Sequence, residues 1–98
     1  MSRTVTFHRL AGLEVQEGAA YYGDVGDGLG AAFIDEIERA ARALMEHPES
    51  GPVVRDPVRK KVIRRFPYTL FYTVRPGEVR VLAVGHQKRR PFYWARRR

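Results

Sequence analysis

The sequence predicts an α+β fold in a single compact domain that spans residues 1–98. The length is typical of one domain, because domains commonly contain about 100–150 residues. Apolar side chains recur with a helical period between residues 11 and 44, and from Pro57 onward they recur at every second residue, as in strands. The predicted order is an N-terminal strand, a helical hairpin and a three-stranded antiparallel meander (β-α-α-β-β-β), with the helices against one sheet face.

The first predicted elements are a short strand and a helix. Residues 4–8 alternate apolar and polar side chains, which is typical of a half-buried strand. In the helix that follows, Glu14 and Glu17 are expected toward the edge of the apolar face. A glycine-rich stretch at 23–28 ends this helix, because glycine is unfavourable in helices and favourable in turns. The apolar face is predicted to contain Ala11, Val15, Gly18 and Tyr22.

The second helix has the clearest pattern in the chain. Asp27 is a plausible N-cap, and the helix should end at His47, because a proline disfavours helical geometry in the residue before it. The two helices are then joined by a short glycine-rich turn. The apolar stripe is predicted to contain Leu29, Phe33, Ile37, Ala40 and Leu44.

Three strands are expected in the second half of the chain. The alternating segments cover residues 59–66, 68–74 and 79–85. Arg75-Pro76-Gly77-Glu78 separates the last two and has the residues of a tight turn, with proline fixing φ and glycine accepting a positive φ.

Charge is distributed very unevenly along the chain. The net charge is +7, but residues 1–52 have 4 Lys/Arg against 9 Asp/Glu, whereas residues 53–98 have 14 against 2. A basic face of this kind favours a polyanionic or acidic partner. The chain has no cysteine, no secretory leader and no apolar run of the roughly 18 residues that a membrane span requires, so we expect a soluble, cytoplasmic protein.

No motif for a metal, a nucleotide or another cofactor is recognisable, and none is expected. The three histidines, at positions 8, 47 and 86, lack the spacing of metal ligands and are interpreted as ordinary polar residues. The candidate site is instead a basic and aromatic cluster, because arginine binds phosphate or carboxylate through two parallel hydrogen bonds and aromatic rings can stack on bases. The predicted partner-binding residues of this cluster are Arg64, Arg65, Tyr68, His86, Lys88, Arg89, Arg90, Tyr93 and Trp94.

A structural interpretation of the aromatic residues stays open beside the functional one. Tyr68, Phe71 and Tyr72 could belong to the core, and Phe92 and Trp94 could simply cover the sheet edge. The terminal arginines at 96–98 are expected to form a frayed, solvated end.

Several segments, taken in order, resemble the RelE/ParE toxin superfamily over nearly the whole chain. They are Ala11 to Tyr22, Leu29-Gly30 to Phe33, Pro48 to Gly51, Val62 to Tyr72, and Val81 to Trp94. The resemblance implies a compact toxin encoded with a cognate antitoxin, which usually wraps an apolar and partly acidic segment around the toxin. The basic half of the chain suits such a partner, because complementary potentials accelerate and orient association.

Members of this superfamily differ in target, since one branch cuts mRNA on the ribosome and the ParE branch inhibits DNA gyrase without cutting RNA. The RNA-cleaving branch commonly has an arginine at the position of Thr69 and another at the position of Gln87, whereas Tyr93 matches its late tyrosine. Phe66-Pro67-Tyr68 and the Arg-x-Pro-x-Tyr-Trp segment resemble ParE and plasmid-stabilisation members more closely.

Three hypotheses follow from the sequence. The first is a non-catalytic growth-inhibiting toxin that binds a protein target, plausibly gyrase, and is neutralised by its antitoxin. The alternative is a ribosome-dependent, metal-independent mRNA endoribonuclease. A plain nucleic-acid-binding module is the third, and its affinity should fall steeply with salt. The candidate catalytic residues of the nuclease would be Arg64, Arg65, Lys88, Arg89 and Tyr93.

Overall fold

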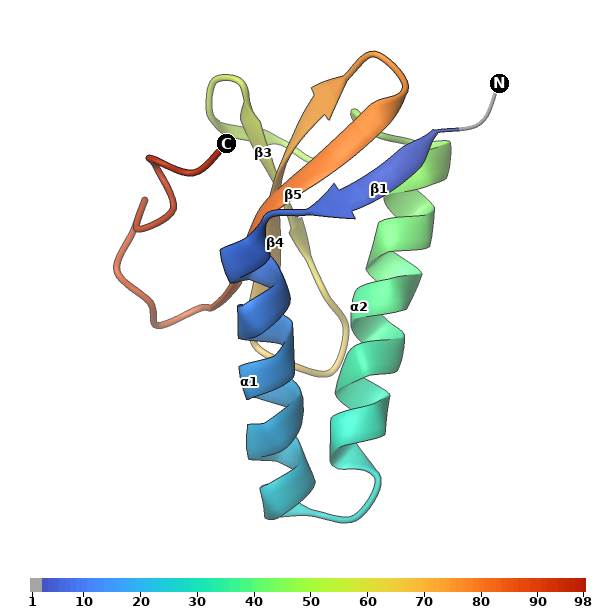
Figure 1. The fold of residues 1–98 in the computed structure, drawn as a ribbon, viewed down its shortest axis with the longest axis vertical. Helices are drawn as coiled ribbons and strands as arrows, with labels where there is room; N and C mark the ends of the chain where they lie inside the picture. Colours follow the sequence, from blue (N-terminus) through green and yellow to red (C-terminus); the bar gives the residue numbers. More distant parts are fainter. Residues whose placement is uncertain (1–2) are drawn as a thin grey trace.

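The computed structural model describes residues 3–98 and contains two helices and five strands within that range (Figure 1). Its elements follow the predicted order, with one strand more than expected. They are β1 (Thr4–Phe7), α1 (Arg9–Val25), α2 (Leu29–Glu46), β2 (Val53–Arg55), β3 (Val58–Val62), β4 (Tyr68–Arg75) and β5 (Glu78–His86).

The strands form one sheet in the order β1-β5-β4-β3-β2. The meander β3-β4-β5 is antiparallel, as predicted, whereas β1 joins the edge of β5 in parallel. β1 pairs only along residues 78–81 of β5, so its last residue, Phe7, lies opposite Val81. Figure 1 shows α1 starting directly after β1, beside the part of β5 that β1 does not reach.

The helices form the predicted hairpin and contact each other closely. The apolar stripe of α2 is confirmed, with Phe33, Ile37, Ala40 and Leu44 all buried, and α2 ends before His47 as expected. Asp27 was predicted as the N-cap of α2, and this prediction is wrong. Gly28 occupies the N-cap position with φ +78°, a conformation that glycine tolerates and aspartate seldom adopts. Within residues 3–98, neither helix is long and apolar enough to cross a bilayer.

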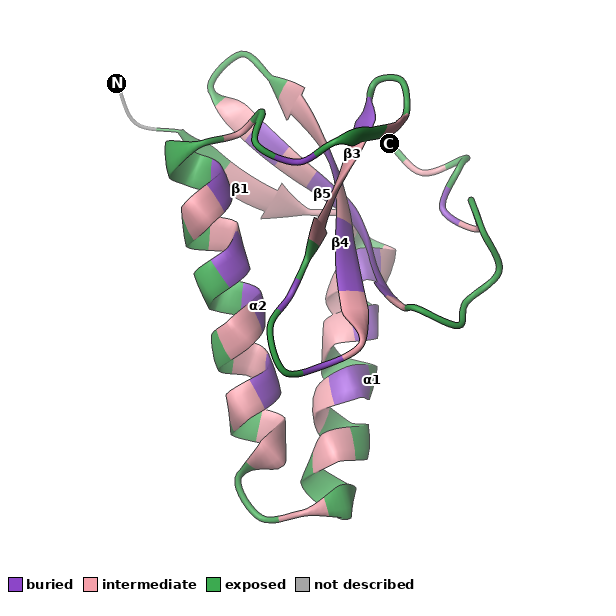
Figure 2. Cartoon of the chain, turned by 180° about the vertical axis from the view of Figure 1, so that it is seen from behind, coloured by how far each residue is buried: buried purple, intermediate pink, exposed green. Residues whose placement is uncertain are grey.

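Apolar side chains pack on both faces of the sheet. On the helix-covered face, residues of α1 and α2 form one cluster with sheet residues such as Leu70, Tyr72 and Val81. Figure 2 shows buried positions along both helices and along β4 and β5. On the opposite face, which we call the outer face, Trp94 packs with Leu82 and its neighbours. A bulge in β5 opposite Phe71 and Tyr72 lets Leu82 and Ala83 both join the outer cluster.

Two strand predictions require correction. The sequence analysis missed β2, which pairs with β3 across the Asp56-Pro57 turn. It also extended β3 to Phe66, whereas the strand ends at Val62. Ile63 and Phe66 are both buried in the helix-side cluster, and a spacing of three residues cannot place both side chains on one face of a strand. Arg65 lies between them with φ +71° and turns the chain.

Candidate functional site

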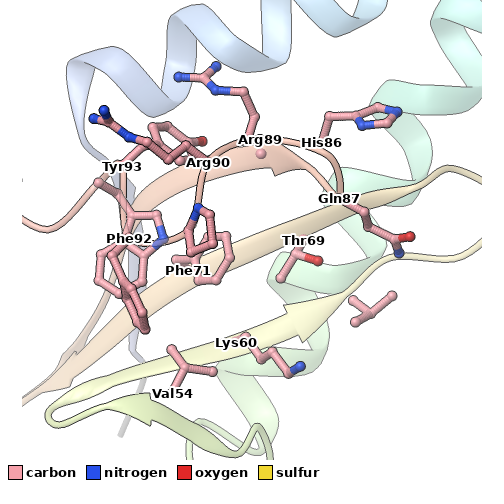
Figure 3. A pocket seen from close by; sticks show the side chains of 14 residues that line it. Val54, Lys60, Thr69, Phe71, His86, Gln87, Arg89, Arg90, Phe92 and Tyr93 are labelled. Carbon is pink, nitrogen blue, oxygen red and sulfur yellow. The ribbon is translucent and has the colours of Figure 1, made fainter.

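The candidate site is a cleft of about 370 Å³ on the outer face, which we call the outer cleft. β2, β3 and β4 line one side, and the end of β5 with the segment after it lines the other (Figure 3). The lining residues are Val54, Lys60, Val62, Thr69, Phe71, Gly85, His86, Gln87, Arg89, Arg90, Pro91, Phe92, Tyr93 and Trp94.

The outer cleft combines an apolar floor with a cationic rim. Phe71 on β4 stacks on Trp94 with 5.0 Å between ring centroids, and Val62 on β3 is 53% exposed. The rim residues Lys60 and Arg90 add positive charge, and none of the lining residues is acidic. Arg89 also lines the cleft, with its Nη1 3.8 Å from Glu14 Oε2. Such a surface can bury an apolar side chain and neutralise carboxylates beside it.

Phe92 places an aromatic ring at the rim of the outer cleft. It is 45% exposed, its ring lies 5.7 Å from that of Trp94, and the guanidinium of Arg55 lies 5.1 Å from its centroid. Its φ is +59°, a conformation that is costly for a bulky residue. The surrounding contacts therefore hold this ring at the surface in spite of local backbone strain.

Tyr93 lies deeper, with two guanidinium groups close to its ring. Arg89 lies 3.9 Å and Arg97 5.0 Å from the ring centroid. The ring packs on Gly85, where a Cβ would approach the Tyr93 hydroxyl to 2.6 Å, so only glycine leaves room for it. The hydroxyl is buried and has no hydrogen-bond partner of good geometry within residues 3–98. Burial, and then the negative charge of Glu14, raise the pKa of Tyr93 well above its usual range.

Glu14 and Arg97 support this arrangement from behind, and the sequence analysis missed both. Glu14 does not lie at the helix edge as predicted; it is buried against β5, with its carboxylate bonded to Arg97 at 2.8 Å and 3.1 Å. Arg97 is accordingly no frayed end, since only 13% of its side chain is exposed. A signal existed for Glu14, because the spacing of Ala11, Glu14 and Gly18 places all three on one helical face.

Five of the nine predicted binding residues line the outer cleft, and the other four lie elsewhere. His86, Arg89, Arg90, Tyr93 and Trp94 line the outer cleft, although Trp94 is buried and supports it from within. Lys60, Gln87 and Phe92 are among the lining residues that the predicted cluster did not include.

The remaining predicted residues lie outside the outer cleft. Arg64 lines a separate cavity beside α2, with Glu36. Arg65 packs its guanidinium over the ring of Phe66, 5.6 Å from the centroid. Tyr68 points to the helix side, with its ring centroid 4.9 Å from that of Phe33.

His86 and Lys88 lie close together at the end of β5. His86 Nδ1 accepts a hydrogen bond from the Lys88 backbone N–H at 3.0 Å, and Lys88 is exposed. Within residues 3–98, no group of three or more histidine, cysteine, aspartate or glutamate side chains is placed to hold a metal ion.

Comparison with known proteins identifies a family and a similar fold. The model of the family described as "ParE toxin of type II toxin-antitoxin system, parDE" matches residues 5–91. A solved chain of the chromosomal ParDE toxin–antitoxin system from P. aeruginosa has a similar fold, with a TM-score of 0.75 and 17% sequence identity over 87% of this chain and 96% of that chain. No curated protein sequence matches the chain.

Proposed function

Because the chain belongs to the ParE family of type II toxins, we propose that it inhibits growth by binding DNA gyrase without catalysing a reaction, and that a cognate antitoxin neutralises it. The outer cleft is the observation that carries this proposal, since its apolar floor and cationic rim suit a protein segment with apolar and acidic side chains. A cytoplasmic location is part of the same proposal, because gyrase acts there.

The site is less suited to the alternative, RNA cleavage on the ribosome. Thr69 and Gln87, which match the arginine positions of the RNA-cleaving branch, both line the outer cleft and are uncharged. General acid–base catalysis requires a group within hydrogen-bond reach of the proton that it transfers. The Tyr93 hydroxyl is buried, and its raised pKa opposes formation of a phenolate base.

The antitoxin is proposed to use the same chemistry as the target. The basic charge of residues 53–98 and the apolar residues exposed on the outer face, Val62 and Phe92, favour a partner segment that alternates apolar and acidic side chains. Competition between antitoxin and gyrase for overlapping cationic groups would then explain neutralisation.

The first prediction tests the gyrase target with purified enzyme. We expect excess toxin to block supercoiling of relaxed plasmid DNA, and Arg90→Ala to weaken the inhibition about threefold to tenfold, because it removes a rim charge. Arg42→Ala removes the same charge from an exposed site on α2 and should inhibit like the wild type. Unchanged supercoiling at excess wild-type toxin would exclude gyrase as the target.

Primer extension on transcripts from cells that express the toxin distinguishes gyrase inhibition from the alternative, RNA cleavage on the ribosome. Intact transcripts during growth arrest are expected from a gyrase inhibitor. Codon-positioned cuts that disappear in Tyr93→Phe would instead establish the nuclease and overturn the proposal.

A further inference from the structure

Strand β5 continues beyond the point where its neighbour β1 ends. β1 reaches Val81, whereas β5 extends to His86. The edge of β5 after Val81 is therefore not paired with β1, and α1 and the end of the chain lie against it instead. A strand edge has backbone groups that need hydrogen-bond partners when they are buried.

Two side chains supply those partners. The backbone N–H of Val84 donates to Glu14 Oε1 at 2.9 Å, and Arg97 Nη1 donates to the carbonyl of Leu82 at 3.1 Å. The Arg97 guanidinium also binds both carboxylate oxygens of Glu14, at 2.8 Å and 3.1 Å. The pair thus offers β5 one acceptor and one donor two residues apart, which is the pattern that a neighbouring strand would offer.

Arg97 also fixes the segment that forms the rim of the outer cleft. This C-terminal segment, residues 87–98, starts where the N–H of Gln87 donates to the carbonyl of Pro67 at 2.8 Å, and Arg97 binds near its other end. Trp94 is buried between these two points. The basic rim residues are therefore held between two anchors and a buried aromatic side chain.

The energetic balance makes the pair sensitive to substitution. The side chains of Glu14 and Arg97 are only 10% and 13% exposed. Arg89 is the other cation near Glu14, but its Nη1 lies 3.8 Å from Glu14 Oε2 and its side chain is 51% exposed. Removing Arg97 therefore leaves the buried Glu14 carboxylate with only this more distant, solvent-exposed partner, which is destabilising. Without Arg97, that penalty is relieved when water reaches Glu14, and water enters most readily when the C-terminal segment leaves β5.

We propose that Glu14 and Arg97 are positioning residues of the outer cleft, which close the edge of β5 and thereby hold the basic rim in place for an acidic partner. The identity of that partner rests on the proposed function. The positioning itself is a property of the free toxin and can be measured without any partner.

The test compares Arg97→Ala with Arg96→Ala, which removes the same charge from an exposed neighbour. Trp94 is the only tryptophan, so acrylamide quenching of its fluorescence reports whether the C-terminal segment stays on the sheet. We expect quenching in Arg97→Ala to rise towards that of the urea-unfolded chain, with helical circular dichroism retained, and inhibition of gyrase to weaken about tenfold or more. Arg96→Ala should match the wild type in both measurements.

A swapped pair separates edge closure from simple charge pairing. The double variant Glu14→Arg with Arg97→Glu keeps opposite charges, but it places a donor against the Val84 N–H and an acceptor against the Leu82 carbonyl. We expect Trp94 to remain as accessible as in Arg97→Ala. Full protection of Trp94 in the swapped variant would overturn the proposed edge closure.

Two further outcomes keep this inference distinct from the proposed function. Wild-type quenching of Trp94 in Arg97→Ala would overturn the positioning role, whatever the target is. If wild-type toxin does not inhibit gyrase, the proposed function fails, and increased quenching in Arg97→Ala but not in Arg96→Ala would still support the positioning role.

Discussion

At the residue scale, His8 links the start of α1 to pH. Its Nδ1 accepts a hydrogen bond from the backbone N–H of Leu10 at 3.0 Å and so caps the helix. This bond requires an unprotonated Nδ1. Burial, followed by the positive charge of Arg97 and then Arg80, lowers the pKa of His8 below 6.5. The folded protein therefore binds a proton at His8 less readily than the unfolded chain does.

The second prediction concerns the pH dependence of stability. With a lowered folded-state pKa, His8 contributes stability above about pH 6.5 that is lost as pH falls through the folded-state pKa. His8→Asn retains a capping side chain that does not titrate, so the fall in melting temperature between pH 7.5 and about pH 5 should become smaller.

The matched control is His47→Asn at the exposed end of α2, which should not reproduce the effect of His8→Asn. Equal pH dependence of melting in His8→Asn and the wild type would contradict the assigned role of His8.

At the element scale, the helical hairpin depends on small residues where α1 meets α2. A Cβ at Gly30 would lie 2.7 Å from the carbonyl oxygen of Ala19, and one at Gly18 would lie 2.7 Å from the ring of Phe33. The backbone carbonyl cannot move without moving α1, whereas the ring can rotate or shift. Gly30 is therefore the stricter of the two requirements.

The third prediction tests this packing by urea unfolding. We expect Gly30→Ala to lower the free energy of unfolding by about 1–3 kcal/mol, because the helices must separate to admit a methyl group. Gly12→Ala is the matched control on α1, where a Cβ meets nothing within 4 Å. It should raise the free energy of unfolding by roughly 0.5–1 kcal/mol through helix propensity. Stabilisation by Gly30→Ala would show that the helices are not in contact there.

At the scale of the whole molecule, the charge asymmetry of the chain becomes an asymmetry of surfaces. The acidic residues of the first half lie mainly on the helical hairpin, whereas the basic second half forms most of the sheet and the C-terminal segment. A positive surface of this kind raises the rate at which an acidic partner arrives in a suitable orientation.

The fourth prediction follows from the electrostatic attraction of this positive surface and concerns antitoxin binding. The association rate constant should fall steeply as salt rises from about 50 to about 300 mM, because the Debye length shortens over that range, while the dissociation rate constant changes much less. Stopped-flow or surface-based kinetics measure both. An association rate constant that is independent of salt would show that the basic surface does not guide the encounter.

The sequence alone determined the order of all elements except β2, the helical hairpin and the composition of the basic, aromatic C-terminal part. These features depend on local rules: a period of 3.6 residues from Leu29 to Leu44, a period of two from Tyr68 onward, and a turn at Pro76-Gly77. The same local rule failed after Val62, where burial of Phe66 beneath the helices replaced strand alternation.

Only the tertiary structure decided which charged residues meet. Arg64 and Arg89 were predicted to belong to one cluster, yet the loop after β3 turns Arg64 toward α2, while Arg89 stays at the outer cleft. Glu14 and Arg97 are 83 positions apart in the chain, and they meet because β1 ends early and leaves an edge of β5 for them. The periodicity of a sequence indicates which face of its own helix or strand a residue occupies. Whether two charged residues far apart in the chain form an ion pair depends on where the neighbouring strands end.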